Sequence, residues 1–103
     1  MLIYKVFRAA EWAELDAAGQ TDGAPVDRAD GFIHFSTAEQ LHGTLQRHFG
    51  GETGLWLLAV DAGAAAPDLR WEPSRGGALF PHLYRPLARA DILWARPFED
   101  GPP

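Results

Sequence analysis

Two short segments of the chain share one pattern, in which an aromatic residue, a histidine and a hydroxyl-bearing residue occupy alternate positions. The rows are Phe32, His34 and Ser36 in the first segment, and Phe80, His82 and Tyr84 in the second. Successive side chains of a β-strand point to opposite faces, so each row lies on one face of its strand. Histidine exchanges protons near neutral pH and also binds metals. The repeated pattern is therefore the strongest candidate for a functional site.

A metal site is one chemistry that these side chains could perform. His34, His82 and Glu72 would supply three ligands, the number that a catalytic zinc site takes from the protein. The sequence, however, contains no HExxH motif and no two histidines separated by one or three residues. We therefore expect no metal.

Nucleophilic hydrolysis through Ser36 is a second chemistry. We expect Ser36 to lie where a strand passes into a helix, as the nucleophile of many hydrolases does, but the G-x-S-x-G pattern is absent. Glu39 follows Ser36 by three residues, which is a capping-box pattern. This spacing predicts that Ser36 is the N-cap of a helix over residues 37–49, a role that accounts for the serine without catalysis.

A site for NAD or a related nucleotide is the third chemistry, and it is the one that we predict. In such a site His34, with Ser36 and Thr37 beside it, would hydrogen-bond a ribose. The ring of Tyr84 would stack on a ring of the ligand, and the guanidinium of Arg75 would meet a phosphate.

The remaining polar groups of the second segment complete this predicted site. The backbone N–H groups of Gly76 and Gly77 would contact an anion, as glycine-rich turns can. His82 and Glu72 would transfer a proton or stabilise a developing positive charge. A non-catalytic module that binds a metabolite or a protein in the same cleft is the alternative, and turnover distinguishes the two.

The composition agrees with a small anionic ligand. The chain has 103 residues, no cysteine and a formal net charge of −5, so it lacks the basic footprint of a nucleic-acid-binding protein. Between residues 70 and 96, however, five arginines accompany only two carboxylates. They would form either a local basic patch that holds an anion or arginines scattered over a solvated surface. No apolar run approaches the roughly 20 residues that span a bilayer. Together with the missing cysteines, this predicts a cytoplasmic protein without membrane contact.

The pattern of elements predicts one α+β domain over residues 1–103. We expect strands at 2–7, 32–35, 55–60, 69–72, 79–84 and 92–95, and helices at 9–18 and 37–49. The strand at 55–60 is apolar on both faces and should be central, whereas Pro81 predicts an edge position for 79–84. Residues 19–28 should form a loop, and residues 99–103 a ragged tail.

Four segments carry a resemblance to a known family. They are residues 30–37 (DGFIHFST), 57–61 (LLAVD), 71–77 (WEPSRGG) and 80–84 (FPHLY). On these segments the chain is identified as a member of the bacterial family catalogued as domain of unknown function 952. That family is similar in fold to the ADP-ribosyltransferases, which implies a compact domain of two small packed β-sheets with two helices around a dinucleotide cleft.

The resemblance also implies a function, namely binding of NAD as a substrate with transfer of ADP-ribose or cleavage of the nicotinamide bond. His34, with Ser36 and Thr37 after it, matches the strand histidine that holds the nicotinamide ribose in that wider group. Glu72 is the nearest match to the transferases' catalytic glutamate, although the usual E-x-E or Q-x-E context is absent. His82 and Tyr84 belong to this family's own pattern.

Overall fold

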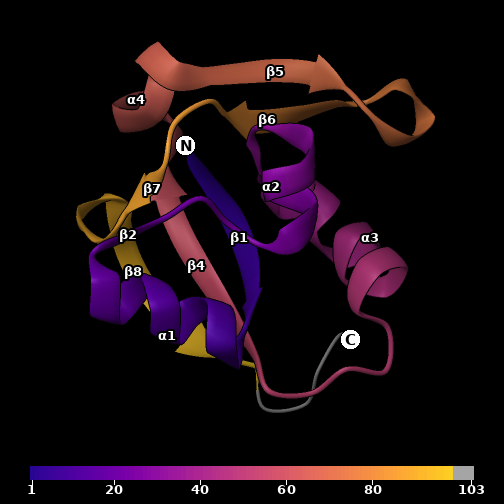
Figure 1. Cartoon of the computed structure of the whole chain (residues 1–103). Helices are drawn as coiled ribbons and strands as arrows, with labels where there is room; N and C mark the ends of the chain where they lie inside the picture. Colours follow the sequence, from indigo (N-terminus) through magenta and orange to yellow (C-terminus); the bar gives the residue numbers. More distant parts are fainter. Residues whose placement is uncertain (99–103) are drawn as a thin grey trace.

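The computed structural model of the chain describes residues 1–98, apart from the side chain of Arg75. Within that range the chain forms four α-helices and eight β-strands (Figure 1). The helices are α1 (Ala9–Ala18), α2 (Pro25–Asp30), α3 (Ala38–Phe49) and α4 (Ala62–Ala65). The strands are β1 (Leu2–Arg8), β2 (Gln20–Thr21), β3 (Ile33–His34), β4 (Leu55–Asp61), β5 (Leu69–Pro73), β6 (Leu79–Leu83), β7 (Leu87–Ala88) and β8 (Ile92–Pro97).

The strands make three small antiparallel sheets, with the orders β1-β4-β8, β2-β7 and β3-β6-β5. The α+β class is thus confirmed, but the expected two sheets and two helices are wrong for the described residues. The additional elements are short: β2 and β7 pair over two residues each, and α4 has four residues. Elements of this length are too short to show a hydrophobic period, so the pattern could not indicate them.

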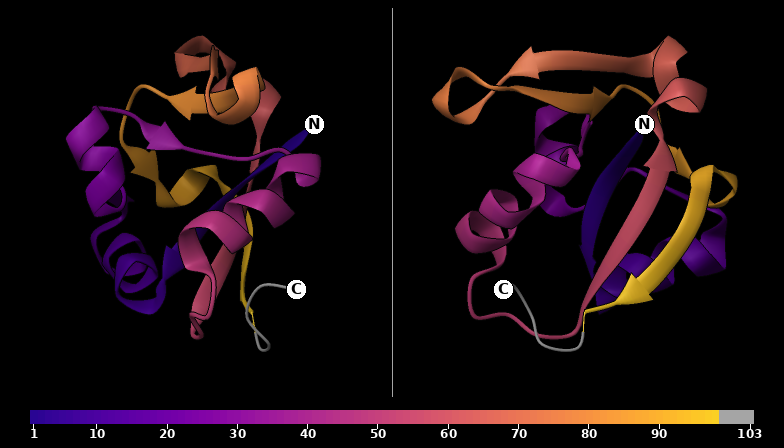
Figure 2. Two further views of the ribbon diagram at one scale, coloured as in Figure 1. Left: turned by 90° about the vertical axis from the view of Figure 1, so that its right-hand side faces the viewer. Right: turned by 180° about the vertical axis from the view of Figure 1, so that it is seen from behind.

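Strand β4 lies between β1 and β8 (Figure 2, right), which confirms its predicted central position. Apolar side chains cover both faces of this sheet, because alternate residues of β1 and β4 enter two different clusters. One cluster includes Ile3, Phe7 and Leu58, and the other includes Val6 and Leu57. Helix α3 packs beside β1 on the second face (Figure 1).

Helix α2 occupies part of the segment that we expected to be a loop. Pro25 is its first residue, and Gly31 ends it in the left-handed conformation with φ of 83°. Both positions are typical of helix boundaries. The carboxylate of Asp27 accepts a hydrogen bond from the N–H of Ala24 at 2.8 Å, which satisfies a donor at the start of this short helix.

The N-cap of α3 is Thr37, so the prediction that Ser36 caps this helix is wrong. The Thr37 hydroxyl accepts from the N–H of Gln40, and the Gln40 side-chain oxygen accepts from the N–H of Thr37. Ser36 is still extended, because its backbone N–H and C=O both pair with Tyr4. The helix therefore begins one residue later than the Ser36–Glu39 pattern indicated.

Strand β6 is the central strand of its sheet, so the predicted edge position is also wrong. The register places Pro81 opposite Phe35, one residue beyond the end of β3. The N–H of Phe35 still donates to the Pro81 carbonyl at 3.0 Å. Because β3 is only two residues long, the missing N–H of Pro81 falls where the ladder ends, and the loss is small.

No helix in residues 1–98 has the length and apolar character that crossing a membrane requires. The predicted tail at 99–103 lies outside the described residues.

Candidate functional site

His34 and His82 lie directly opposite each other in the β3–β6 ladder. Residues paired in this way on antiparallel strands place their side chains on the same face of the sheet. Their ring centroids are 5.2 Å apart, with the rings at 66°. The same antiparallel register brings Phe32 beside Tyr84, with ring centroids 5.1 Å apart. The two rows found in the sequence therefore face the same side and run in opposite directions.

Phe32 joins the two histidines into one aromatic cluster. Its ring stacks on His82 with centroids 4.2 Å apart and packs against His34 with centroids 4.6 Å apart. The guanidinium of Arg70 lies over the ring of Tyr84 on the same face, 4.6 Å from its centroid. The Tyr84 ring is therefore already stacked within the protein.

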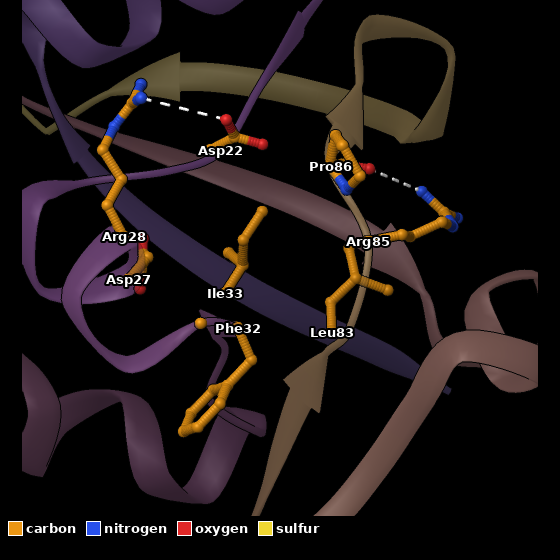
Figure 3. Close-up of a pocket in the computed structure, with 9 residues that line it drawn as sticks. Asp22, Asp27, Arg28, Phe32, Ile33, Leu83, Arg85 and Pro86 are labelled. Carbon is orange, nitrogen blue, oxygen red and sulfur yellow. Dashed lines mark hydrogen bonds and ion pairs between the residues drawn. The ribbon is translucent and has the colours of Figure 1, made fainter.

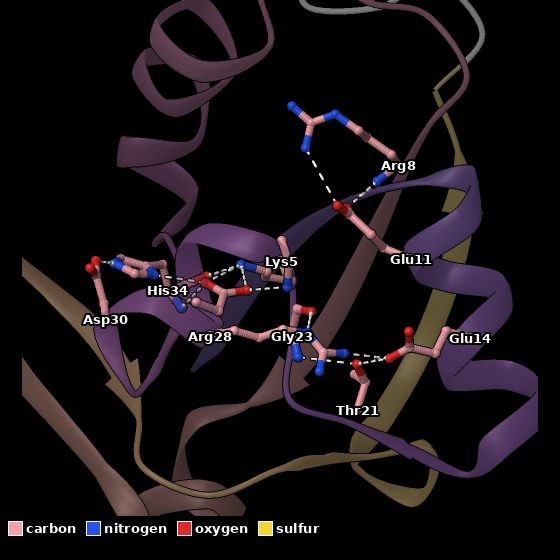
Figure 4. A network of polar contacts seen from close by, with 11 residues as sticks. Lys5, Arg8, Glu11, Glu14, Thr21, Gly23, Arg28, Asp30 and His34 are labelled. Atoms are coloured by element: carbon pink, nitrogen blue, oxygen red, sulfur yellow. Dashed lines mark hydrogen bonds and ion pairs between the residues drawn. The ribbon is translucent and has the colours of Figure 1, made fainter.

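The ring of His34 lies between two carboxylates, both from α2. Its Nδ1 atom is 2.7 Å from Oδ1 of Asp27, and its Nε2 atom is 3.0 Å from Oδ2 of Asp30. Figure 4 shows His34 between Asp30 and the network that continues to Lys5. The Asp30 side chain is 46% exposed, whereas that of Asp27 is fully buried. Asp27 is thus a fixed partner of the imidazole, and Asp30 can turn into solvent.

Asp27 is the hub of this network. Its carboxylate also accepts from the backbone N–H of His34 and from the ammonium of Lys5, which lies 2.8 Å from Oδ2 and is itself buried. Burial alone would raise the pKa of Asp27, but the hydrogen bond from His34 and the charge of Lys5 outweigh it and hold the pKa at about 2. Burial lowers the pKa of Lys5 below its usual range, although Asp27 opposes the change.

His82 has its own carboxylate. Its Nδ1 atom is 2.8 Å from Oε1 of Glu72, and the hydroxyl of Tyr84 donates to the same oxygen at 2.7 Å. Both hydrogen bonds lower the pKa of Glu72, and the bond from Tyr84 has the larger effect. The carboxylate in turn raises the pKa of the Tyr84 phenol. Both histidines therefore have Nδ1 tied to a carboxylate.

A cavity of about 750 Å³ lies in front of both histidines, between β1, α2, α3 and β6; we call it the histidine cleft. Its volume is within the range of small-molecule sites. Its charged wall residues are Lys5, Arg8 and Arg47, with Glu11 and Asp30, and its other wall residues include Tyr4, Ser36 and Phe80. Lys5 and Arg8 have carboxylate partners. Arg47 is exposed and pairs with no carboxylate among residues 1–98.

A second cavity of about 300 Å³ is lined by Asp27, Phe32 and Leu83, among others (Figure 3). Arg28 and Arg85 are its cationic wall residues. Arg28 is bonded to Glu14, and Arg85 is bonded to Asp68 and Asp91. Since these cations are already paired, the histidine cleft is the better place for an anionic ligand.

The structure brings some of the predicted site residues together and separates others. His34, His82 and Ser36 line the histidine cleft, where the Ser36 hydroxyl is 2.7 Å from that of Thr44. Glu72 and Tyr84 do not line it but hold His82, and Thr37 caps α3. Gly76 and Gly77 have positive φ in the exposed turn between β5 and β6 and do not line the cleft. The side chain of Arg75 lies outside the described part of the chain.

The charged residues of the site that were missed include Lys5, Asp27 and Asp30 around His34, and Arg47 on the cleft wall. The signal for Lys5 was present, because it lies between Ile3 and Phe7 on the buried row of β1. A lysine at such a position requires a partner. Nothing in the sequence indicated that the partner would be Asp27, 22 residues away.

No group of three or more His, Cys, Asp or Glu side chains in the described residues is arranged to hold a metal ion. The expectation that the site works without a metal stays a prediction.

Comparisons with known proteins agree with the family resemblance. Residues 6–95 match the family model described as "Protein of unknown function (DUF952)", and the chain belongs to this family. It is similar to the crystal structure of protein CC0527 from Caulobacter crescentus, with 45% identity over 99% of this chain and 91% of that chain and a TM-score of 0.92. The solution structure of CC0527 is 48% identical over 95% of this chain and 84% of that chain, with a TM-score of 0.85. No curated protein matches the chain.

Proposed function

We propose that this family member has an ADP-ribosyltransferase-like fold and binds NAD or a related anionic nucleotide in the histidine cleft. The observation that carries the proposal is the pairing of His34 with His82 on the wall of a cavity of about 750 Å³. A cavity of this size can hold a nucleotide, and His34, which is one-third exposed, presents ring atoms to it.

Charge supports an anionic ligand at one end of the cleft. Arg47 is a wall cation without a carboxylate partner among residues 1–98, so it can meet a phosphate. The predicted phosphate contact of Arg75 stays a prediction. The hydroxyls of Ser36 and Thr44 lie on the same wall and can bond a ribose. The chemistry of the bound dinucleotide would be transfer of ADP-ribose or cleavage of the nicotinamide bond.

Calorimetric and thermal-shift titrations with NAD, ADP-ribose and nicotinamide test the proposal, and the His34→Ala variant is the first comparison. We expect saturable stabilisation by a dinucleotide, about 2.7 kcal/mol at a concentration 100 times the Kd. The affinity should fall at least tenfold in His34→Ala. The main-chain N–H of His34 and the ammonium of Lys5 continue to bond Asp27, so the variant should fold.

His42→Ala is the matched control, because His42 is exposed on α3 and does not line the cleft. Equal affinities for wild type and both variants, or no binding of any of the three compounds, would reject the proposal. Release of nicotinamide from bound NAD separates a transferase from a non-catalytic binding module.

A further inference from the structure

Two adjacent imidazoles, each with one ring nitrogen tied to a carboxylate, form an arrangement suited to general acid–base catalysis. In both His34 and His82 the tied atom is Nδ1, at 2.7 Å from Asp27 and 2.8 Å from Glu72. Both residues line the histidine cleft. Nε2 is therefore the ring atom left for a ligand, which in His34 must first displace Asp30. The His82 side chain is 7% exposed.

The two Nε2 atoms differ in the proton that they carry. Nε2 of His34 lies 3.0 Å from Asp30, and since carboxylate oxygens only accept hydrogen bonds, the protonated ring satisfies both Asp27 and Asp30. Glu72 also only accepts, so His82 carries a proton on Nδ1, and the neutral ring then keeps its lone pair on Nε2. The cleft thus offers a proton donor next to a proton acceptor.

We propose that this pair opens cyclic phosphodiesters of nucleotides by hydrolysis, with His82 as the general base and His34 as the general acid. The inference rests on the proposed function, because it requires a nucleotide in the histidine cleft. A phosphodiester uses both partners, since water must lose a proton and the departing oxygen must gain one. The nicotinamide–ribose bond needs no acid, because nicotinamide leaves as a neutral molecule.

The proposed step balances without a further reagent. Nε2 of His82 takes a proton from water while the water oxygen forms a bond to phosphorus. The bond from phosphorus to one ribose oxygen breaks, and that oxygen receives the proton from Nε2 of His34. The product is a nucleoside phosphate monoester, and exchange of one proton with solvent restores both rings.

The neighbouring groups have supporting roles in this step. Asp30 is half-exposed, so a substrate can displace it from Nε2 of His34 while Asp27 keeps hold of Nδ1. Glu72 is a positioning residue, which fixes the tautomer of His82 and is itself fixed by Tyr84. Arg47 would meet the non-bridging phosphate oxygens.

The test is incubation of the protein with 2′,3′-cyclic AMP, followed by chromatography of the adenosine phosphates. We expect the monoester as product, and a fall in kcat of about 100-fold or more for His82→Gln and for His34→Asn, the size of a general acid–base contribution. Glu72→Gln, which keeps the shape of the side chain, should lower kcat about tenfold and leave KM within about twofold. His42→Asn, outside the cleft, should retain the wild-type rate.

Thermal unfolding of each variant shows whether it is folded, and NAD titration of the same samples distinguishes the two proposals. A protein that binds NAD but leaves 2′,3′-cyclic AMP intact would overturn the hydrolysis and leave the proposed function standing. A protein that binds neither compound would overturn both. Hydrolysis at the wild-type rate by folded His82→Gln or folded His34→Asn would also overturn the assignment of the pair.

Discussion

The ammonium nitrogen of Lys5 lies 2.8 Å from Oδ2 of Asp27, and both side chains are buried. This ion pair links β1 to α2 beside His34. It also places the carboxylate where it can hold Nδ1 of His34, at 2.7 Å. The geometry of the candidate site therefore depends on a buried charge pair, and the stability of the fold and the orientation of the histidine are linked.

Asp27→Asn should destabilise the protein by about 3–5 kcal/mol, because it leaves the Lys5 charge buried without a partner. Urea unfolding measures the loss. The double variant Lys5→Met/Asp27→Asn should be more stable than Asp27→Asn alone, since no uncompensated charge remains. As a control, Asp16→Asn removes an exposed partner of Arg89 and should cost less than about 1 kcal/mol. A loss for Asp27→Asn as small as that of the control would contradict the prediction.

Acid should reduce the stabilising effect of Asp27. Its pKa is about 2 in the folded protein and ordinarily 3.8, so its contribution is fully present above about pH 4 and is lost as the pH falls towards 2. At pH 5 the free energy of unfolding should be larger for wild type than for Asp27→Asn. At pH 2 this difference between the two proteins should be smaller by about 2 kcal/mol. Parallel curves for the two proteins over this range would show that Asp27 titrates normally.

The phenol of Tyr84 should ionise at lower pH once Glu72 loses its charge, because the hydrogen bond to the carboxylate raises the pKa of Tyr84. The chain has two tyrosines, so a Tyr4→Phe background isolates the signal of Tyr84 in a spectrophotometric titration. In that background Glu72→Gln should shift the curve to lower pH, and Glu39→Gln, on exposed α3 surface, should not. Identical curves would mean that the Tyr84–Glu72 bond does not persist in solution.

The sequence predicted the longer elements that carry a clear local signal. Strands β1 and β4 and helix α1 lie where we expected them. The continuous apolar run indicated β4, and Gly19 marked the end of α1. Helix α2 was interpreted as a loop, since Asp22, Gly23 and Pro25 are also typical of turns. Pro25 and Gly31 are equally typical of the start and the end of a helix. The local sequence therefore fits both a loop and a helix, and the contacts of this six-residue segment with Lys5 and His34 select the helix.

For the site, the sequence predicted the two rows but not their surroundings. Alternation alone placed His34 and His82 on definite strand faces, whereas their direct pairing depends on the β3–β6 register. That register is set by packing over the whole fold, as are the ion pairs that reach Asp27 from distant positions. The N-cap was misplaced for the same reason, because Ser36 pairs with Tyr4 and the cap falls on Thr37.

Thr37→Ala should therefore cost about 1 kcal/mol of stability through the loss of the α3 cap, and Thr37→Ser should restore most of it. Glu39→Ala should cost only a few tenths of a kcal/mol, because Gln40 and not Glu39 closes the capping box. Chemical denaturation of the three variants measures these differences. A larger loss for Glu39→Ala than for Thr37→Ala would restore the capping role to Ser36.

Asp30→Asn should strengthen binding of anionic nucleotides about three- to tenfold, because it removes a negative charge beside Nε2 of His34 on the cleft wall. Arg47→Ala should weaken binding by a similar factor, and both effects should shrink at high salt, since the two side chains are exposed. Calorimetric titration with ADP-ribose at two salt concentrations measures them, with Glu39→Gln as the matched charge control outside the cleft. If Asp30→Asn instead weakens binding, Asp30 accepts a hydrogen bond from the ligand, and the cleft would recognise hydroxyl groups at this position rather than a phosphate.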